Sequence, residues 1–144
     1  MFQNLQKPDK DYLFMTIKVS GLIGGHSGVD IDKNRGNAIK ILAELINRIS
    51  AEGDVVIASI DGGNLHNAIP REASATIGVE FKIKETARVI TNMYIAEKQN
   101  ELIGETLEID LSTTDKAETV FAPSISKSLI KAILVCPQLL LQPN

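Results

Sequence analysis

One histidine near the start of the chain lies among glycines and is the first candidate for chemistry. His26 stands in the run GGHSG, and four glycines fall within positions 21–28. An imidazole can donate a hydrogen bond to a developing oxyanion, or act as an acid near neutral pH. Glycines permit left-handed backbone and close approach by another chain. The run therefore favours a histidine presented to a reacting group, with an ordinary polar turn as the alternative.

A second feature is the run DGGNLHNAIPREA at positions 61–73. Two glycines interrupt the preceding apolar stretch, and Pro70 restricts Ile69 to an extended conformation. Asn67 is thereby placed between two predicted strand ends, with an amide that can both donate and accept hydrogen bonds. A capped hairpin turn explains the same residues. On this sequence both interpretations stay open.

Spacing excludes several well-known sites. GGHSG is not a nucleophile elbow, because Val29 stands where the second glycine belongs. No Gly-Lys-Ser/Thr follows it, so it is not a phosphate-binding loop. The run DIDKNRG imitates a calcium loop, but Arg35 occupies the glycine position and Ile41 the position of the bidentate glutamate.

A metal centre or a catalytic triad is equally weakly supported. The two histidines and Cys136 lie far apart, and neither C-x-x-C nor H-E-x-x-H occurs. His26 with Asp30 would make half a metal site at most. Ser27, His66 and an aspartate could form a triad only if the fold assembled them. The chain alone therefore does not resemble a complete enzyme, and no metal ligands are predicted in it.

Hydrophobic periodicity predicts the element order strand, helix, strand, strand, helix, strand. The predicted strands are 11–20, 54–60, 73–83 and 105–112, and the predicted helices are 38–49 and 85–102. In the second helix the apolar stripe is assigned to Ala87, Ile90, Met93, Tyr94 and Ala96. This βαββαβ order is the split βαβ, or ferredoxin-like, pattern of the α+β class. It predicts a four-stranded antiparallel sheet with two helices on one face.

The two chemical candidates should meet at one end of this sheet. The first two strands of a split βαβ unit run parallel, so the loops that follow them leave the sheet at the same end. His26 and Asn67 are therefore expected at the same end of the sheet, here called the rim, where the first two strands of the unit end. This shared position strengthens a functional interpretation of both.

The C-terminal part is predicted to be an extension of a domain spanning 11–113. A third helix is expected from Ser124, with one apolar side, and residues 114–144 form a helical extension. The end of the chain, ILVCPQLLLQPN, is rich in large apolar residues that no predicted element covers. Apolar clusters of this kind usually meet a partner, so the extension is interpreted as truncated from a larger chain.

Composition narrows the possible partners. The 144 residues carry a net charge of −3 with scattered basic residues, and only six are aromatic. These features argue against nucleic acid, which needs a concentrated cationic face. The apolar runs are much shorter than the roughly 20 residues of a membrane span. A single cysteine excludes an internal disulfide, and a cytoplasmic location is expected.

Two long runs together resemble a known family. VSGLIGGHSGVDIDKNRGNAIKIL and DGGNLHNAIPREASATIGVEF resemble the lid domain of aminoacyl-histidine (Xaa-His) dipeptidases, the carnosinase-like zinc exopeptidases of bacteria. The resemblance extends from about Asp11 to Cys136, nearly the whole chain. GGHSG, RGNA and NAIPREA occur in the family's order and spacing.

The resemblance implies an enzyme with two domains that have different roles. A catalytic domain would hold two zinc ions and a glutamate base, none of which this chain supplies, and the lid would carry the homodimer interface. His26 matches the lid histidine that reaches into the other subunit's active site and polarises the scissile carbonyl. Asn67 matches a substrate-binding asparagine. His66 stands where an arginine is expected in the family, which leaves that contact open.

The resulting hypothesis is a lid and dimerisation domain of a zinc-dependent dipeptidase acting on Xaa-His dipeptides. Its expected partners are its own catalytic domain, a second copy and the dipeptide substrate. The isolated chain is expected to be inactive. The alternative is a stand-alone ferredoxin-like interaction or small-molecule-sensing module, which would bind a ligand at the 21–28 rim without any catalytic domain. A third possibility is an exopeptidase relative with another substrate.

Overall fold

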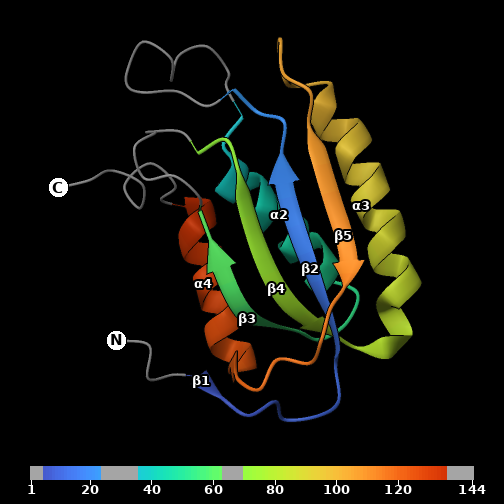
Figure 1. Ribbon diagram of the computed structural model, residues 1–144, viewed down its shortest axis with the longest axis vertical. Helices are drawn as coiled ribbons and strands as arrows, with labels where there is room; N and C mark the ends of the chain where they lie inside the picture. Colours follow the sequence, from blue (N-terminus) through green and yellow to red (C-terminus); the bar gives the residue numbers. More distant parts are fainter. Residues whose placement is uncertain (1–4, 24–35, 63–69, 136–144) are drawn as a thin grey trace, which may run out of the picture.

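The predicted four-stranded sheet is present in the computed structural model, which describes residues 5–23, 36–62 and 70–135 (Figure 1). Its strands are β2 (Leu13–Ser20), β3 (Val55–Asp61), β4 (Ala73–Val79) and β5 (Glu108–Thr113). They lie in the order β3-β4-β2-β5, and every neighbouring pair is antiparallel. This is the strand order of a split βαβ fold, which confirms the predicted class.

Three helices cover one face of the sheet: α2 (Ala38–Ser50), α3 (Lys84–Gln99) and α4 (Pro123–Val135). In Figure 1, α2 lies behind the sheet, α3 runs along the β5 side and α4 along the β3 side. α2 contacts both of the other helices, and α4 also packs against β3. The C-terminal helix is therefore a third member of the helical layer.

The first helix forms where the sequence predicted it, for two local reasons. Asn37 is extended (φ −108°, ψ 109°), and its side chain caps the helix by accepting the backbone N–H of Lys40 at 3.2 Å. Apolar residues then recur every three or four positions, so one stripe faces the sheet. The buried residues of α2 are Ala38, Ile41, Leu42, Ala43, Leu45, Ile46 and Ile49.

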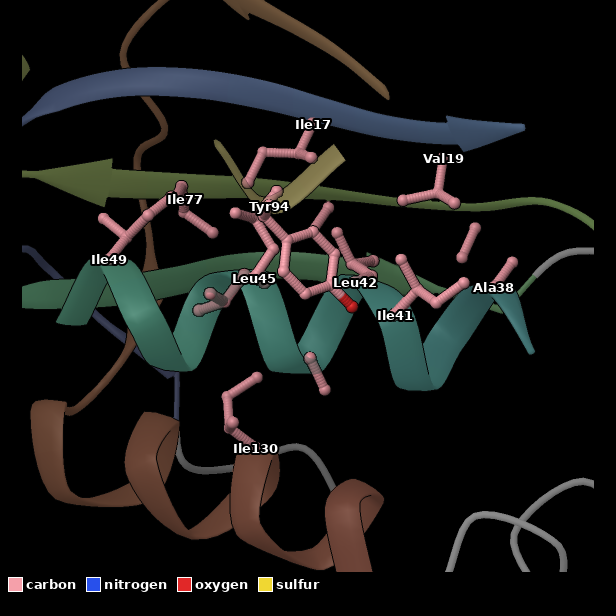
Figure 2. Close-up of a cluster of buried hydrophobic side chains, with 14 of the residues drawn as sticks. Ile17, Val19, Ala38, Ile41, Leu42, Leu45, Ile49, Ile77, Tyr94 and Ile130 are labelled. Atoms are coloured by element: carbon pink, nitrogen blue, oxygen red, sulfur yellow. The ribbon is translucent and has the colours of Figure 1, made fainter. Parts of the chain in front are cut away.

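The core lies between this stripe and the apolar face of the sheet (Figure 2). Ile17 and Val19 of β2 and Ile77 of β4 point toward α2, Tyr94 enters from α3, and Ile130 approaches from α4. Burying each such side chain stabilises the fold by about 1.5–3 kcal/mol. On the opposite face, Tyr12, Phe14, Val56 and Val120 form a second, smaller buried cluster, whereas the part nearer the end of β2 is polar, with Lys18 exposed.

Two predicted elements were too long. The strand predicted over 73–83 ends at Val79, and residues Phe81–Ile83 form a short 3-10 turn. The chain turns there because the Glu80 side chain accepts the backbone N–H of Asp54 at 2.9 Å, and Ile83, not Phe81, enters the core. Phe81 is 57% exposed.

The helix predicted over 85–102 ends at Gln99, and its apolar stripe was partly misplaced. Met93 is 59% exposed and Ala96 is also exposed, while Ala87, Thr91 and Tyr94 are buried. The stripe assigned from sequence was wider than the face that α3 turns to the sheet. Part of it therefore lies on the outer surface of the helix.

A second, small ladder joins the two ends of the described chain. β1 (Leu5–Gln6) pairs antiparallel with β6 (Val120–Phe121). Strands of two residues carry no usable periodicity, so the sequence did not predict them. The separate domain spanning 11–113 stays a prediction, although Ile130 and Ile133 of α4 belong to the main core.

Candidate functional site

The two candidate loops leave the sheet at the same end, as predicted. β2 and β3 are each antiparallel to β4, so they run parallel to each other. β2 ends at Ser20 and β3 at Asp61, and both ends lie beside the start of β4. His26, Ser27, Asp30, His66 and Asn67 lie outside the described residues. Their side-chain geometry, and the roles predicted for His26 and Asn67, stay predictions.

The described flanks of the two loops are in direct contact. The backbone N–H of Ala38 donates to the carbonyl oxygen of Pro70 at 2.9 Å. Ala38 begins α2, ten residues after the GGHSG run ends, and Pro70, which is buried, ends the NAIP run. The fold therefore brings the C-terminal flanks of both candidate segments together at one rim.

A buried carboxylate holds both flanks of the first loop. Glu105 is only 5% exposed, and its two oxygens accept separate backbone N–H groups. One comes from Ile23 and the other from Gly36, each at 2.9 Å. Sequence reasoning missed this residue, because a single glutamate at the predicted start of a strand carries no periodic signal.

The segment that carries Glu105 is itself fixed by Gln99 at the end of α3. The Gln99 Nε2 donates to the carbonyl oxygen of Glu105, and the N–H of Leu107 donates to Gln99 Oε1, both at 2.7 Å. Gly21 packs directly on this segment with φ +86°, and a Cβ at that position would lie 1.9 Å from the Thr106 carbonyl oxygen. Only glycine fits there.

One further polar group at the rim has an unused donor. Asn37 is 8% exposed, and its Oδ1 caps α2. Its Nδ2 is buried without a hydrogen-bond partner within the described ranges. Leaving such a donor unpaired costs about 1–3 kcal/mol, so an acceptor contributed from elsewhere would stabilise this position.

The polar face of the sheet has a shallow hollow of about 280 Å³ at the same end. Its lining residues are Thr16, Lys18, Asp61, Glu72, Ala73 and Ser74. Charges of both signs line it, which suits a small zwitterion better than an extended polyanion.

Within the described ranges, no group of three or more His, Cys, Asp or Glu side chains could hold a metal ion. No described helix is both long and apolar enough to cross a membrane.

Three shifted pKa values, those of Lys10, Asp54 and Glu80, arise from contacts that lie away from the rim. Hydrogen bonds from Lys10 to Asp54 and Glu80 raise the lysine pKa, and the Asp54 pKa is lowered chiefly by the same bond. The Glu80 pKa is lowered first by the Asp54 backbone N–H and then by Lys10. These groups lie where β3 begins and β4 ends, at the opposite end of the sheet. They secure the fold and take no part in the candidate site.

Comparisons with known proteins identify the family to which this architecture belongs. A family model described as a peptidase dimerisation domain matches residues 17–105. The cytosol non-specific dipeptidase of Escherichia coli (strain K12) is 37% identical over 116 residues, which are 74% of this chain and 23% of that protein.

Solved structures agree. Aminoacylhistidine dipeptidase from Vibrio alginolyticus superposes with a TM-score of 0.80 at 29% identity, covering 92% of this chain and 28% of that one. A hydantoinase/carbamoylase family amidase from Burkholderia ambifaria shares the fold, with a TM-score of 0.52 at 13% identity over 84% of this chain and 32% of that one. The chain thus spans about a quarter of the length of the two dipeptidases.

Proposed function

This chain belongs to the peptidase dimerisation domain family, and from that premise we propose that it is the lid and dimerisation domain of a dipeptidase. The observation that carries the proposal is the superposition on a dipeptidase over 92% of the chain at a TM-score of 0.80. The sequence identity of 37% to a second dipeptidase supports the same activity class. The catalytic domain is then a separate part of the enzyme.

The proposed substrate is a dipeptide with a C-terminal histidine. One similar protein is named an aminoacylhistidine dipeptidase and the other a non-specific dipeptidase. A broader dipeptide range is therefore the nearest alternative. The proposal of an Xaa-His substrate predicts that an Ala-His dipeptide is hydrolysed with a higher kcat/KM than Ala-Ala. Equal kcat/KM values would favour the broader range.

We assign His26 the role of hydrogen-bond donor to the scissile carbonyl and Asn67 that of a substrate-binding amide. A neutral imidazole can donate to the oxygen that becomes negative in the tetrahedral intermediate. The assignment is supported by the flanks of the two segments, which leave the sheet at one end and are joined by the Ala38–Pro70 hydrogen bond. In this proposal the histidine acts in the site of the partner subunit.

The remaining chemistry is assigned to the catalytic domain. A metal bound there would supply an activated water at neutral pH, and we place the zinc expected for such an enzyme on that domain. This chain's own contribution is to orient the substrate and to stabilise the oxyanion. The isolated chain is accordingly expected to hydrolyse no dipeptide.

We propose a homodimer that forms through β5 and α3. The β3 edge is obstructed, because Ile57 donates its N–H to the Ser126 hydroxyl of α4 at 3.0 Å and β6 also lies against this strand. β5, in contrast, pairs only with β2 within the described ranges. The adjacent helix α3 exposes Val89 and Met93, at 55% and 59%. An open edge beside an apolar helix face is suited to a second copy of the chain.

A binding measurement separates this proposal from the alternative of a stand-alone sensing module. Calorimetric titration of the isolated chain with Ala-His should show no binding tighter than the millimolar range, because most of the substrate pocket lies on the catalytic domain. Micromolar binding by the chain alone would contradict the proposal and favour the sensing module. Hydrolysis by the complete protein would then be tested separately.

A further inference from the structure

We propose that Glu105 is a positioning residue for the segment that carries His26, acting by fixing both of its ends on one carboxylate. The inference rests on the proposed function, because it assigns Glu105 a role in presenting that histidine. It concerns described residues only: Glu105, its two hydrogen-bond donors and the groups that hold it. Neither the family resemblance nor the sequence pattern singled this residue out.

The contact itself is specific. Both carboxylate oxygens of Glu105 are used, one by the N–H of Ile23 and the other by the N–H of Gly36. These donors lie 82 and 69 residues from Glu105 along the chain, so the contact is purely tertiary. Hydrogen bonds to an ionised acceptor are roughly twice as strong as neutral ones. A buried carboxylate satisfied in this way holds the two donors side by side.

The donors flank one stretch of the chain, residues 24–35, which contains His26. Ile23 is the last described residue before the GGHSG run, and Gly36 is the first described residue after it. Fixing both on a single side chain sets the separation and direction at which the loop leaves the fold. Placing a catalytic group within about 1 Å of its productive position can change a rate by about 100-fold.

Glu105 is held rigidly enough to act in this way. Gln99 binds the backbone on both sides of it, at Glu105 and Leu107. A Cβ on Gly36 would lie 3.0 Å from Leu102 and 3.1 Å from Leu22, so the backbone at this end of the loop is closely packed. A functional side chain is placed accurately when the groups behind it are themselves locked by packing and hydrogen bonds.

The substitution Glu105→Gln tests the carboxylate with almost no change of shape. The amide keeps one acceptor oxygen, but it turns an N–H₂ donor toward the second backbone N–H. One end of the loop should therefore be released while the other stays bound. Glu101→Gln is the matched control, because the Glu101 side chain is 64% exposed and forms a surface ion pair with Lys98 at 3.1 Å.

Amide hydrogen exchange in the full 144-residue chain tests the hydrogen bonds from Ile23 and Gly36 to Glu105 directly. Glu105→Gln should speed exchange at Ile23 or Gly36 by about 10-fold or more, while Met15 and Ile77 in the sheet stay within about twofold of the wild type. The control should leave all four amides unchanged. Equal acceleration everywhere would show a merely stabilising residue and overturn the inference. Unchanged exchange at both Ile23 and Gly36 would also overturn it.

Kinetics of the complete dipeptidase then test the positioning role. Glu105→Gln should lower kcat by about 10-fold or more, with KM within about threefold, since orientation is lost but the binding groups remain. His26→Ala is measured in parallel. If His26→Ala lowers kcat but Glu105→Gln does not, this inference fails and the proposed function stands. If His26→Ala leaves kcat unchanged, the proposed function fails, and with it the positioning role.

Discussion

At the scale of single residues, the rim is built from groups that have little in common in the sequence. Gly21 was recognised as part of a glycine-rich turn, and its φ of +86° and close contact with Thr106 explain why glycine is needed. Glu105 could not be recognised, because its partners are two backbone N–H groups far away along the chain. Motifs reveal side chains that are grouped locally, whereas a tertiary contact to backbone leaves no local pattern.

The first prediction compares two glycines that share a left-handed conformation. Gly21→Ala should destabilise the chain by about 2–5 kcal/mol, combining about 1–2 kcal/mol for the conformation with an overlap penalty of about 1–3 kcal/mol. Gly104 has φ +75° but no atom within 4 Å of a Cβ, so Gly104→Ala should cost only the conformational part. Urea unfolding measures both. Equal losses would show that the Thr106 contact is not restrictive.

The second prediction concerns the pH dependence supplied by Lys10. Its Nζ lies 2.6 Å from Asp54 Oδ2 and 3.2 Å from Glu80 Oε2. Because the pKa of each carboxyl is lowered in the folded state, their stabilisation is present above the ordinary values of 3.8 and 4.5 and is lost as the pH falls below them. The lysine pKa is raised, so its contribution is complete below pH 10.5 and is lost at higher pH.

Lys10→Gln should therefore lower the free energy of unfolding most between about pH 5 and pH 10. The difference from the wild type should shrink as the pH falls toward 3. Lys116→Gln is the control, because Lys116 lies 3.8 Å from Asp11 with both side chains largely exposed. A constant difference at all pH values would show that Lys10 acts through packing and not through these ion pairs.

At the scale of elements, hydrophobic periodicity predicted most of the residues that pack in the core. Met15, Ile17 and Val19 of β2 and the recurring apolar residues of α2 are buried as the periodicity predicted, whereas Phe14 on the other face of β2 is buried as well. Ends were less predictable, because β4 and α3 stop where side chains such as Glu80 and Gln99 bind backbone groups. The stripe predicted on α3 was too wide, because apolar residues such as Met93 also lie on the exposed surface of this helix.

The third prediction tests whether α4 is part of the core. Ile130 is 4% exposed and packs in the main core, so Ile130→Ala should destabilise the whole chain by about 2–4 kcal/mol. Lys131→Ala, on the exposed side of the same helix, should change stability by less than about 0.5 kcal/mol. Thermal unfolding should stay a single transition. A separate, earlier transition for α4 would instead support an independent C-terminal extension.

The fourth prediction locates the proposed dimer interface on α3. Met93→Glu places a charge on an exposed apolar position of α3, the helix that contacts β5, so it should raise the dimer dissociation constant by about 100-fold or more. Val135→Glu is the control, since Val135 is 75% exposed at the end of α4. Light scattering over a concentration series measures both. A dimer weakened only by the control would place the interface on the α4 side.

At the scale of the whole molecule, some features follow from the sequence and others appear only in the structure. Fold class, strand order and the shared rim could be derived from the order of elements, because parallel strands send their loops to one end. The β1–β6 ladder and the packing of the predicted C-terminal helix against the core could not, since both depend on tertiary contacts. In the proposed function, the rim contributes one half of a reactive site and the catalytic domain of the dipeptidase contributes the other half.

The central claim is that His26 supplies a catalytic hydrogen bond in a dipeptidase. The most direct measurement is kcat for Ala-His hydrolysis by the complete enzyme carrying His26→Ala, compared with His66→Ala. The account predicts a fall in kcat of about 100- to 1,000-fold for His26→Ala, the usual cost of losing one oxyanion donor, and a change within about tenfold for His66→Ala. A kcat for His26→Ala within about threefold of the wild type would contradict it.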